Sequence, residues 1–141
     1  MTYLHIIIVP NSQRSIYRNS RITFSYNVTD KYPIEPPEVK CLNKILHPNI
    51  DKNGNVCLNL LREGWKPIYE LHTIIVGLLH LMESIKAGDL EKPLDSDAAD
   101  LMNRDIKEFE KVVQETIKGK SHFGRQFDNV YYVPKKWLHI S

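Results

Sequence analysis

Alternating apolar and polar residues predict β-strands in the first third of the chain. Residues 21–29 alternate without a break, which is typical of a strand with one buried and one exposed face. Shorter apolar segments at residues 4–9 and 38–42 are expected to be strands as well. Short connections between such strands favour an antiparallel sheet. Residues 32–37 contain three prolines, which exclude a helix there and favour an extended segment.

A helical period begins near residue 70. Over about residues 70–84, apolar side chains recur at intervals of three and four and form one broad face of a helix: Leu71, Ile74, Ile75, Leu78, Leu79 and Met82. Strands followed by helices indicate an α+β fold, in which an antiparallel sheet and the helices are segregated along the chain.

Two further helices are indicated by residues that can cap them. Asp95 or Ser96 can begin a short helix, because their side-chain oxygens accept hydrogen bonds from free backbone N–H groups. Asn103 or Asp105 can begin a last helix in the same way. Gly119 is suited to end that helix, since glycine adopts the left-handed conformation that often follows a helix.

Length and charge are those of an ordinary globular protein. The chain has 141 residues, which fits one domain, expected over residues 1–119 with a C-terminal tail over residues 120–141. Its 19 basic and 17 acidic side chains are too balanced for nucleic-acid binding driven by counterion release. No attraction to a membrane surface is expected either. The uncharged stretch between Glu70 and Glu83 is shorter than the about 20 residues that span a bilayer.

The cysteine content indicates a reducing compartment. Two cysteines, Cys41 and Cys57, do not make a disulfide framework. The first residues lack the basic segment of a secretory signal. We therefore expect a protein of the cytoplasm and/or the nucleus.

Cys57 is the best candidate for a reactive group. It follows the turn at Asn53-Gly54, within an aperiodic stretch at residues 43–69, and loops of that length are usually functional. A thiol that reaches solvent there can act as a nucleophile in its thiolate form. Asn49 lies upstream across the same turn, so folding back would bring its side-chain amide near Cys57. Such an amide can stabilise an oxyanion.

Structural roles must be weighed against these assignments. A lone cysteine is most often a core residue, and Cys41, in a predicted strand, is expected to be one. His47 precedes a proline and is expected to fix a loop, while His72 and His80 are expected at the surface. No metal site is expected, because the cysteines and His47 lack the short paired spacing of metal ligands. The local signature of a papain-type protease is also missing.

Taken together, these motifs resemble the ubiquitin-conjugating enzyme family. Their order is Tyr32-Pro33, Pro36-Pro37, His47-Pro48-Asn49, Gly54, Val56-Cys57-Leu58, Trp65 and Pro67. The sequence of residues 55–63, followed by Trp65-Lys66-Pro67, is similar to that of the family branch that carries modifiers of the Nedd/Rub type. The resemblance covers about residues 4–119 and, more weakly, residues 127–130.

The resemblance implies a fold and a reaction. The fold would be the α/β roll of this family, a four-stranded antiparallel meander with helices packed around it. Cys57 would receive the C-terminal glycine of the modifier from an activating enzyme, as a thioester. A lysine of a substrate such as a cullin, guided by a ring-type cullin ligase, would then attack the thioester. No cofactor, metal or nucleotide would be needed on this chain, because the activating enzyme uses the ATP.

Roles for individual residues follow from the same resemblance. Asn49 would support the loop and the oxyanion, Leu58 would pack beside the thioester, and His47 and Pro48 would be structural. Two loops would contact the activating enzyme and the ligase; their residues are Tyr32, Pro33, Pro36, Trp65, Lys66 and Pro67.

The chain departs from the family pattern in two places. Family members have a helix and a strand before the segment that matches residues 4–10, so this chain is expected to be truncated at its N-terminus, with an exposed sheet edge. The family's acidic residue before Pro-Leu falls at Lys92. Asp89, Glu91 or Asp95 is an alternative source of that carboxylate.

Two other functions remain open on this sequence. An ordinary ubiquitin carrier would share most of the motifs. A non-catalytic binding module of the same fold would fit the missing first helix, although Cys57 and Asn49 argue for an enzyme.

Overall fold

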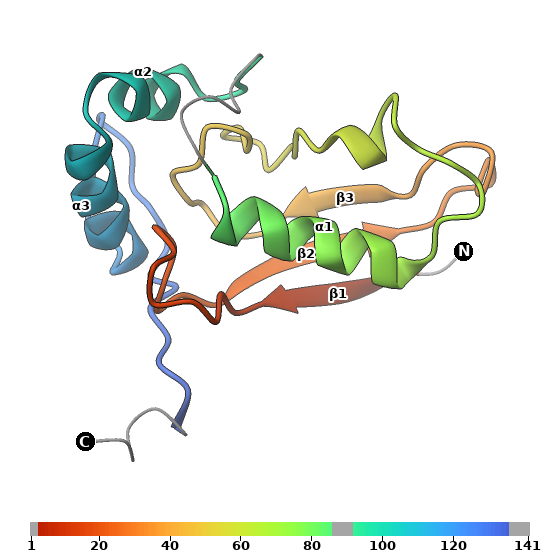
Figure 1. The fold of residues 1–141 in the computed structure, drawn as a ribbon, viewed down its shortest axis with the longest axis horizontal. Helices are drawn as coiled ribbons and strands as arrows, with labels where there is room; N and C mark the ends of the chain where they lie inside the picture. The colour runs from red at the N-terminus through yellow and green to blue at the C-terminus, as the bar shows by residue number, and fades with distance from the viewer. Residues whose placement is uncertain (1–2, 86–91, 136–141) are drawn as a thin grey trace.

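A three-stranded antiparallel sheet forms one layer of the molecule (Figure 1). A computed structural model describes residues 3–85 and 92–135 of the chain. Its strands lie in the order β1, β2, β3, and their bounds are Tyr3–Ile8, Ile22–Asn27 and Glu38–Cys41. All three predicted strands are confirmed: β1 is shifted by one residue, and β2 and β3 are slightly shorter than expected. The four-stranded meander of the family is represented by three strands in this part of the chain.

The alternation in β2 has the predicted consequence for burial. Ile22, Phe24 and Tyr26 are buried, while the residues between them are partly exposed. Helix α1 (Leu71–Glu83) lies across the sheet in Figure 1. Its most buried side chains are Ile74, Leu78, Leu81 and Met82. The sheet and α1 therefore enclose the main core, which the period of both segments predicted.

Two helices lie beyond the end of the sheet: α2 (Ser96–Arg104) and α3 (Ile106–Ile117). The first is capped by Asp95, whose carboxylate accepts a hydrogen bond from the N–H of Ala98 (3.1 Å). The second is capped by Asp105, which accepts one from the N–H of Glu108 (3.1 Å). Gly119 follows α3 with a φ of +87°, so this predicted helix end is confirmed. No helix in residues 3–85 and 92–135 is long and apolar enough to cross a membrane.

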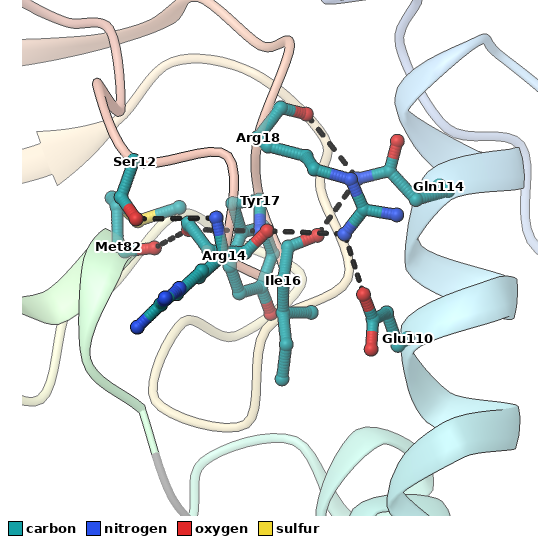
Figure 2. Close-up of polar contacts among 9 residues, drawn as sticks. Ser12, Arg14, Ile16, Tyr17, Arg18, Met82, Glu110 and Gln114 are labelled. Atoms are coloured by element: carbon teal, nitrogen blue, oxygen red, sulfur yellow. Dashed lines mark hydrogen bonds and ion pairs between the residues drawn. The ribbon is translucent and has the colours of Figure 1, made fainter.

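The segment between β1 and β2 connects the sheet to α1 and α3 (Figure 2). The Ser15 hydroxyl donates to the carbonyl oxygen of Met82 (2.8 Å), near the end of α1. The Arg18 guanidinium donates to the Glu110 carboxylate, and the Gln114 amide donates to the carbonyl oxygen of Ile16 (2.8 Å). These contacts hold α3 against the body of the molecule.

The proline-rich segment differs from expectation. The N–H of Tyr32 donates to the carbonyl oxygen of Thr29 (3.1 Å), and that of Glu35 donates to the carbonyl oxygen of Lys31 (2.9 Å). Residues 30–34 therefore form turns and are not extended. The prediction was wrong there because the fixed φ of proline suits a turn as well as an extended chain.

The residues after α3 share the core of the domain. Phe127 and Val130 are buried, and the N–H of Val130 donates to the carbonyl oxygen of Ile117 (2.8 Å). The carbonyl oxygen of Val130 accepts from the N–H of Arg21 (2.9 Å), just before β2. No period in the sequence marks this segment, because isolated bridges and two buried side chains hold it in place. Residues 136–141 of the expected tail lie outside the described residues.

Candidate active site

A tight turn brings Asn49 and Cys57 side by side. The N–H of Cys57 donates to the carbonyl oxygen of Asn49 (2.8 Å). Inside the turn, the Asp51 carboxylate accepts hydrogen bonds from the N–H groups of Asn53 and Asn55 and from the Asn55 amide, each at 2.9 Å. Burial alone would raise the pKa of Asp51, but these hydrogen bonds and the charge of Lys40 lower it overall.

Glycine is required at the centre of this turn. Gly54 has a φ of +83°, and a Cβ placed on it would lie 2.3 Å from the carbonyl oxygen of Cys41. Its own carbonyl oxygen accepts from the N–H of Cys41 (2.8 Å), so the turn is fastened to the end of β3. The sheet thus provides a rigid base for the loop that carries Cys57.

The two thiols have different surroundings. Cys41 is buried, and burial raises the pKa of its thiol to about 12, although a hydrogen bond with the backbone of Asn43 opposes this. Such a thiol stays protonated and unreactive at neutral pH. Cys57 is half-buried and therefore more exposed than Cys41. Leu58, beside it, is also half-buried and packs against the core.

His47 is a buried part of the loop scaffold. Its Nε2 lies 3.1 Å from the carbonyl oxygen of Leu81, and its Nδ1 accepts from the N–H of Asn49 (3.0 Å). These partners require a proton on Nε2 and none on Nδ1. The ring stacks on Tyr17, with 5.0 Å between centroids. Burial lowers the pKa of His47 to about 4, although the Leu81 carbonyl and Asp95 oppose this. The imidazole is therefore neutral at pH 7 and positions Asn49.

Pro48 joins this loop to the segment before α2. Its carbonyl oxygen accepts from the N–H of Leu94 (2.9 Å) and from that of Asp95 (3.1 Å). Lys92, at the start of that segment, is exposed. Leu94 also lines a cleft together with Leu61 and Arg62. Of the three alternative sources of a carboxylate, Asp89 and Glu91 lie outside the described residues, and Asp95 is buried and paired with Arg125.

The two loops with expected partner contacts meet at Trp65. Its indole N–H donates to the carbonyl oxygen of Pro33 (2.9 Å), and its ring centroid lies 6.0 Å from that of Tyr32. Pro36 is half-buried nearby in the chain, whereas Lys66 and Pro67 are exposed.

Comparison with known proteins decides the family. A model of the ubiquitin-conjugating enzyme family matches residues 1–117. The chain belongs to the ubiquitin-conjugating enzyme family. This confirms the resemblance that the motifs around Cys57 indicated.

The relatives belong to the neddylation branch. The chain is 49% identical over 118 residues to the NEDD8-conjugating enzyme UBC12 of Eremothecium gossypii, covering 84% of this chain and 62% of the relative. It is 43% identical over 130 residues to that of Schizosaccharomyces pombe, covering 92% of this chain and 71% of the relative. The solved structure of Saccharomyces cerevisiae Ubc12 matches with a TM-score of 0.85 at 42% identity, covering 94% of this chain and 68% of that one. The chain thus spans about two thirds of the length of these relatives.

Sequence reasoning missed two exposed side chains of this conjugating-enzyme domain. Ile34 is 77% exposed and Ile68 is 81% exposed, and they lie on the two loops that the Trp65–Pro33 hydrogen bond joins. The available signal was a large apolar residue directly after a proline in a loop, since Ile34 follows Pro33 and Ile68 follows Pro67. Within the described ranges, no cluster of histidine, cysteine and carboxylate side chains could hold a metal ion.

Proposed function

We propose that this chain carries a modifier of the NEDD8 type as a thioester on Cys57 and transfers it to a lysine of a protein substrate such as a cullin. The observation that carries the proposal is the half-buried Cys57, fastened through its backbone to Asn49, in a chain whose relatives are named NEDD8-conjugating enzymes.

The first step is an exchange of thioesters. The Cys57 thiolate attacks the carbonyl carbon of the modifier's C-terminal glycine, which arrives as a thioester on its activating enzyme. A new C–S bond forms and the thiolate of the activating enzyme leaves. The ATP of the pathway is used by the activating enzyme, so this chain needs no cofactor of its own.

The second step forms an amide. The lone pair of a lysine amine attacks the thioester carbon, the bond to the Cys57 sulfur breaks, and the amine loses a proton to solvent or to a nearby base. Negative charge develops on the carbonyl oxygen in between. An amide N–H from Asn49 is suited to stabilise that charge. His47 supports Asn49 through the backbone and is neutral at pH 7, so it acts as a positioning residue.

The partners are a NEDD8-type modifier, its activating enzyme, a ring-type cullin ligase and the cullin. Exposed Ile34 and Ile68, together with Pro33, Lys66 and Pro67, support a docking role for the loops around Trp65, since an exposed apolar patch often marks a protein-binding site. The reaction needs neither nucleic acid nor membrane. We place it in the cytoplasm and/or the nucleus, where free thiols persist.

Charging assays test the proposal directly. The chain is incubated with ATP and either NEDD8 or ubiquitin, each with its own activating enzyme, and the adduct is followed on gels with and without reductant. We expect a reductant-sensitive NEDD8 adduct that Cys57→Ala abolishes. Cys57→Ser should give a reductant-stable ester, because an alkoxide is a poorer leaving group than a thiolate. Cys41→Ala serves as the matched control and should still charge.

Other outcomes contradict the proposal in distinct ways. Charging with ubiquitin alone would make the chain an ordinary ubiquitin carrier. Binding of a modifier without any adduct would make it a non-catalytic module. An adduct that survives Cys57→Ala but not Cys41→Ala would overturn the assignment of the thiol.

A further inference from the structure

A largely buried ion pair lies next to the candidate active site. Nη1 of Arg125 is 2.8 Å from Oδ2 of Asp95, and Nη2 is 3.9 Å from the Asp97 carboxylate. The side chains of Arg125 and Asp95 are only 16% and 3% exposed. Arg125 belongs to the segment after α3, outside the motifs around Cys57.

A tight turn holds Arg125 in place. The N–H of Arg125 donates to the carbonyl oxygen of His122 (2.9 Å), and the N–H of His122 donates to the carbonyl oxygen of Arg125 (3.1 Å). The two residues between them, Phe123 and Gly124, have φ values of +55° and +68°. The guanidinium also lies over the ring of Phe127, 5.1 Å from its centroid. The cation therefore comes from a fixed turn with a packed side chain.

Asp95 connects Arg125 to the loop that carries Asn49 and Cys57. Its Oδ1 caps α2, and its N–H, together with that of Leu94, donates to the carbonyl oxygen of Pro48. The next residue is Asn49, whose carbonyl oxygen accepts the N–H of Cys57. A continuous set of contacts thus runs from Arg125 to the backbone of the cysteine.

Stability alone does not account for the pair. Nε and Nη2 of Arg125 are buried and have no hydrogen-bond partner in the described part of the chain. A buried ion pair whose hydrogen bonds are incomplete is often no more stabilising than apolar residues of similar size. A role in fixing geometry explains the pair better.

We propose that Arg125 is a positioning residue for the transfer step. Acting through Asp95, it fixes Leu94 and Asp95, which hold the carbonyl of Pro48 and, through the next residue, Asn49 beside Cys57. This rests on the proposed function of Cys57. In charging, the activating enzyme presents the thioester, so the placement of Asn49 matters less. In transfer to a small amine, the placement of Asn49 sets how well the charge that develops on the carbonyl oxygen is stabilised.

The test compares charging with discharge. Arg125→Gln is charged with NEDD8, the activating enzyme is quenched, and single-turnover discharge to free lysine is measured. Misplacing reacting atoms by 1 Å can cost about a hundredfold in rate, so we expect discharge to slow by roughly tenfold or more. Charging should stay within about twofold, and Arg125→Lys, which keeps the cation, should recover part of the loss.

Asp95→Asn tests whether the effect passes through Asp95. Asparagine also caps helices well, so α2 keeps its cap while the charge pair is lost. We expect the same discharge defect in Asp95→Asn, and little further loss in the double variant, because the two residues act as a unit. Arg18→Gln removes the ion pair between Arg18, in the segment before β2, and Glu110 of α3, and should change neither step.

Amide hydrogen exchange gives a reading that needs no modifier. The N–H groups of Leu94 and Asp95 should exchange faster in Arg125→Gln, while those of buried α1 residues such as Leu78 should not change. If the wild-type chain fails to charge, the proposed function fails and this exchange still tests the contact. Unchanged exchange at both amides, discharge at the wild-type rate, or equal losses in charging and discharge would each overturn the proposal.

Discussion

Single residues determine the chemistry available at Cys57. Three of them act on one short loop: Gly54 permits the turn, His47 holds the backbone of Asn49, and the Asn49 carbonyl holds the cysteine. Each substitution therefore has a separate expected effect, on the turn, on the support of the loop or on the transition state.

Asn49→Ala should slow transfer far more than charging. Loss of an amide donor to a developing oxyanion costs roughly a hundredfold or more in rate. The measurement is single-turnover discharge of the charged chain to free lysine, beside the rate of charging. Asn53→Ala, which removes an exposed amide from the same turn, is the control. If charging and discharge fall by the same factor, Asn49 supports the loop and not the transition state.

His47 predicts a dependence of stability on pH. Its pKa is lowered to about 4 in the folded chain, below its ordinary value of 6.5, so protonation favours unfolding. The stability from the neutral imidazole is complete above pH 6.5 and is lost as the pH falls towards 4. A difference of this size corresponds to about 3 kcal/mol. Urea unfolding between pH 7 and pH 4 measures it.

The control for His47 is an exposed histidine. His72→Gln should keep the acid-dependent loss of stability, because His72 lies on the exposed side of α1. His47→Gln should reduce that loss, although it also lowers stability at pH 7. An unchanged pH dependence in His47→Gln would show that other groups cause it.

At the scale of elements, loops are joined to each other and only partly to the sheet. The turn before Cys57 is fastened to β3, the segment before α2 is fastened to Pro48, and the Trp65 loop is fastened to Pro33. The loop that carries Cys57 is therefore held by two separate parts of the chain, β3 and the segment before α2. A change of charge in the segment before α2 should alter the reaction without altering the fold.

Lys92→Asp should speed discharge to free lysine several-fold. With Lys92 placed beside the thioester, we expect its cation to repel an approaching ammonium, whereas a carboxylate there could orient the amine or accept its proton. The variant and wild type are charged, and their discharge rates are compared across pH. Lys111→Asp, on α3, makes the same change of net charge at an exposed site and should have no effect.

The opposite result has a definite meaning. If Lys92→Asp leaves discharge unchanged while Asp89→Ala or Glu91→Ala slows it, the carboxylate of the site lies earlier in the segment. Lys92 would then have no place beside the thioester.

At the scale of the whole molecule, the segment after α3 completes the domain. Phe127 and Val130 are buried in the same core as the sheet, and Arg125 reaches the cap of α2. The domain expected over residues 1–119 thus shares its core with residues beyond that boundary.

Phe127→Ala should therefore destabilise the entire domain. Replacing a buried phenylalanine by alanine costs about 3–5 kcal/mol, from lost burial and the cavity that remains. Urea unfolding followed by circular dichroism measures the change in the free energy of unfolding. Tyr131→Ala, at a half-exposed neighbour, should cost much less. Equal small effects would show that the segment contributes little to the core.

The sequence by itself determined the features that depend on neighbouring residues. The alternation around Phe24 predicted a half-buried strand, and Asp95 and Asp105 were among the predicted caps, because periods and caps act over a few positions. The motif around Cys57 also identified the family before any contact was known.

Only the tertiary structure decided which distant residues meet. Trp65 pairs with Pro33, and Arg125 with Asp95, across separations of 32 and 30 residues, and no local period records such contacts. Burial also decided the pKa of the Cys41 thiol, since the strand pattern predicted a core residue but not how far packing would raise that pKa. The physical reason is that packing is a property of the whole folded chain, whereas hydrophobic period is a property of one segment.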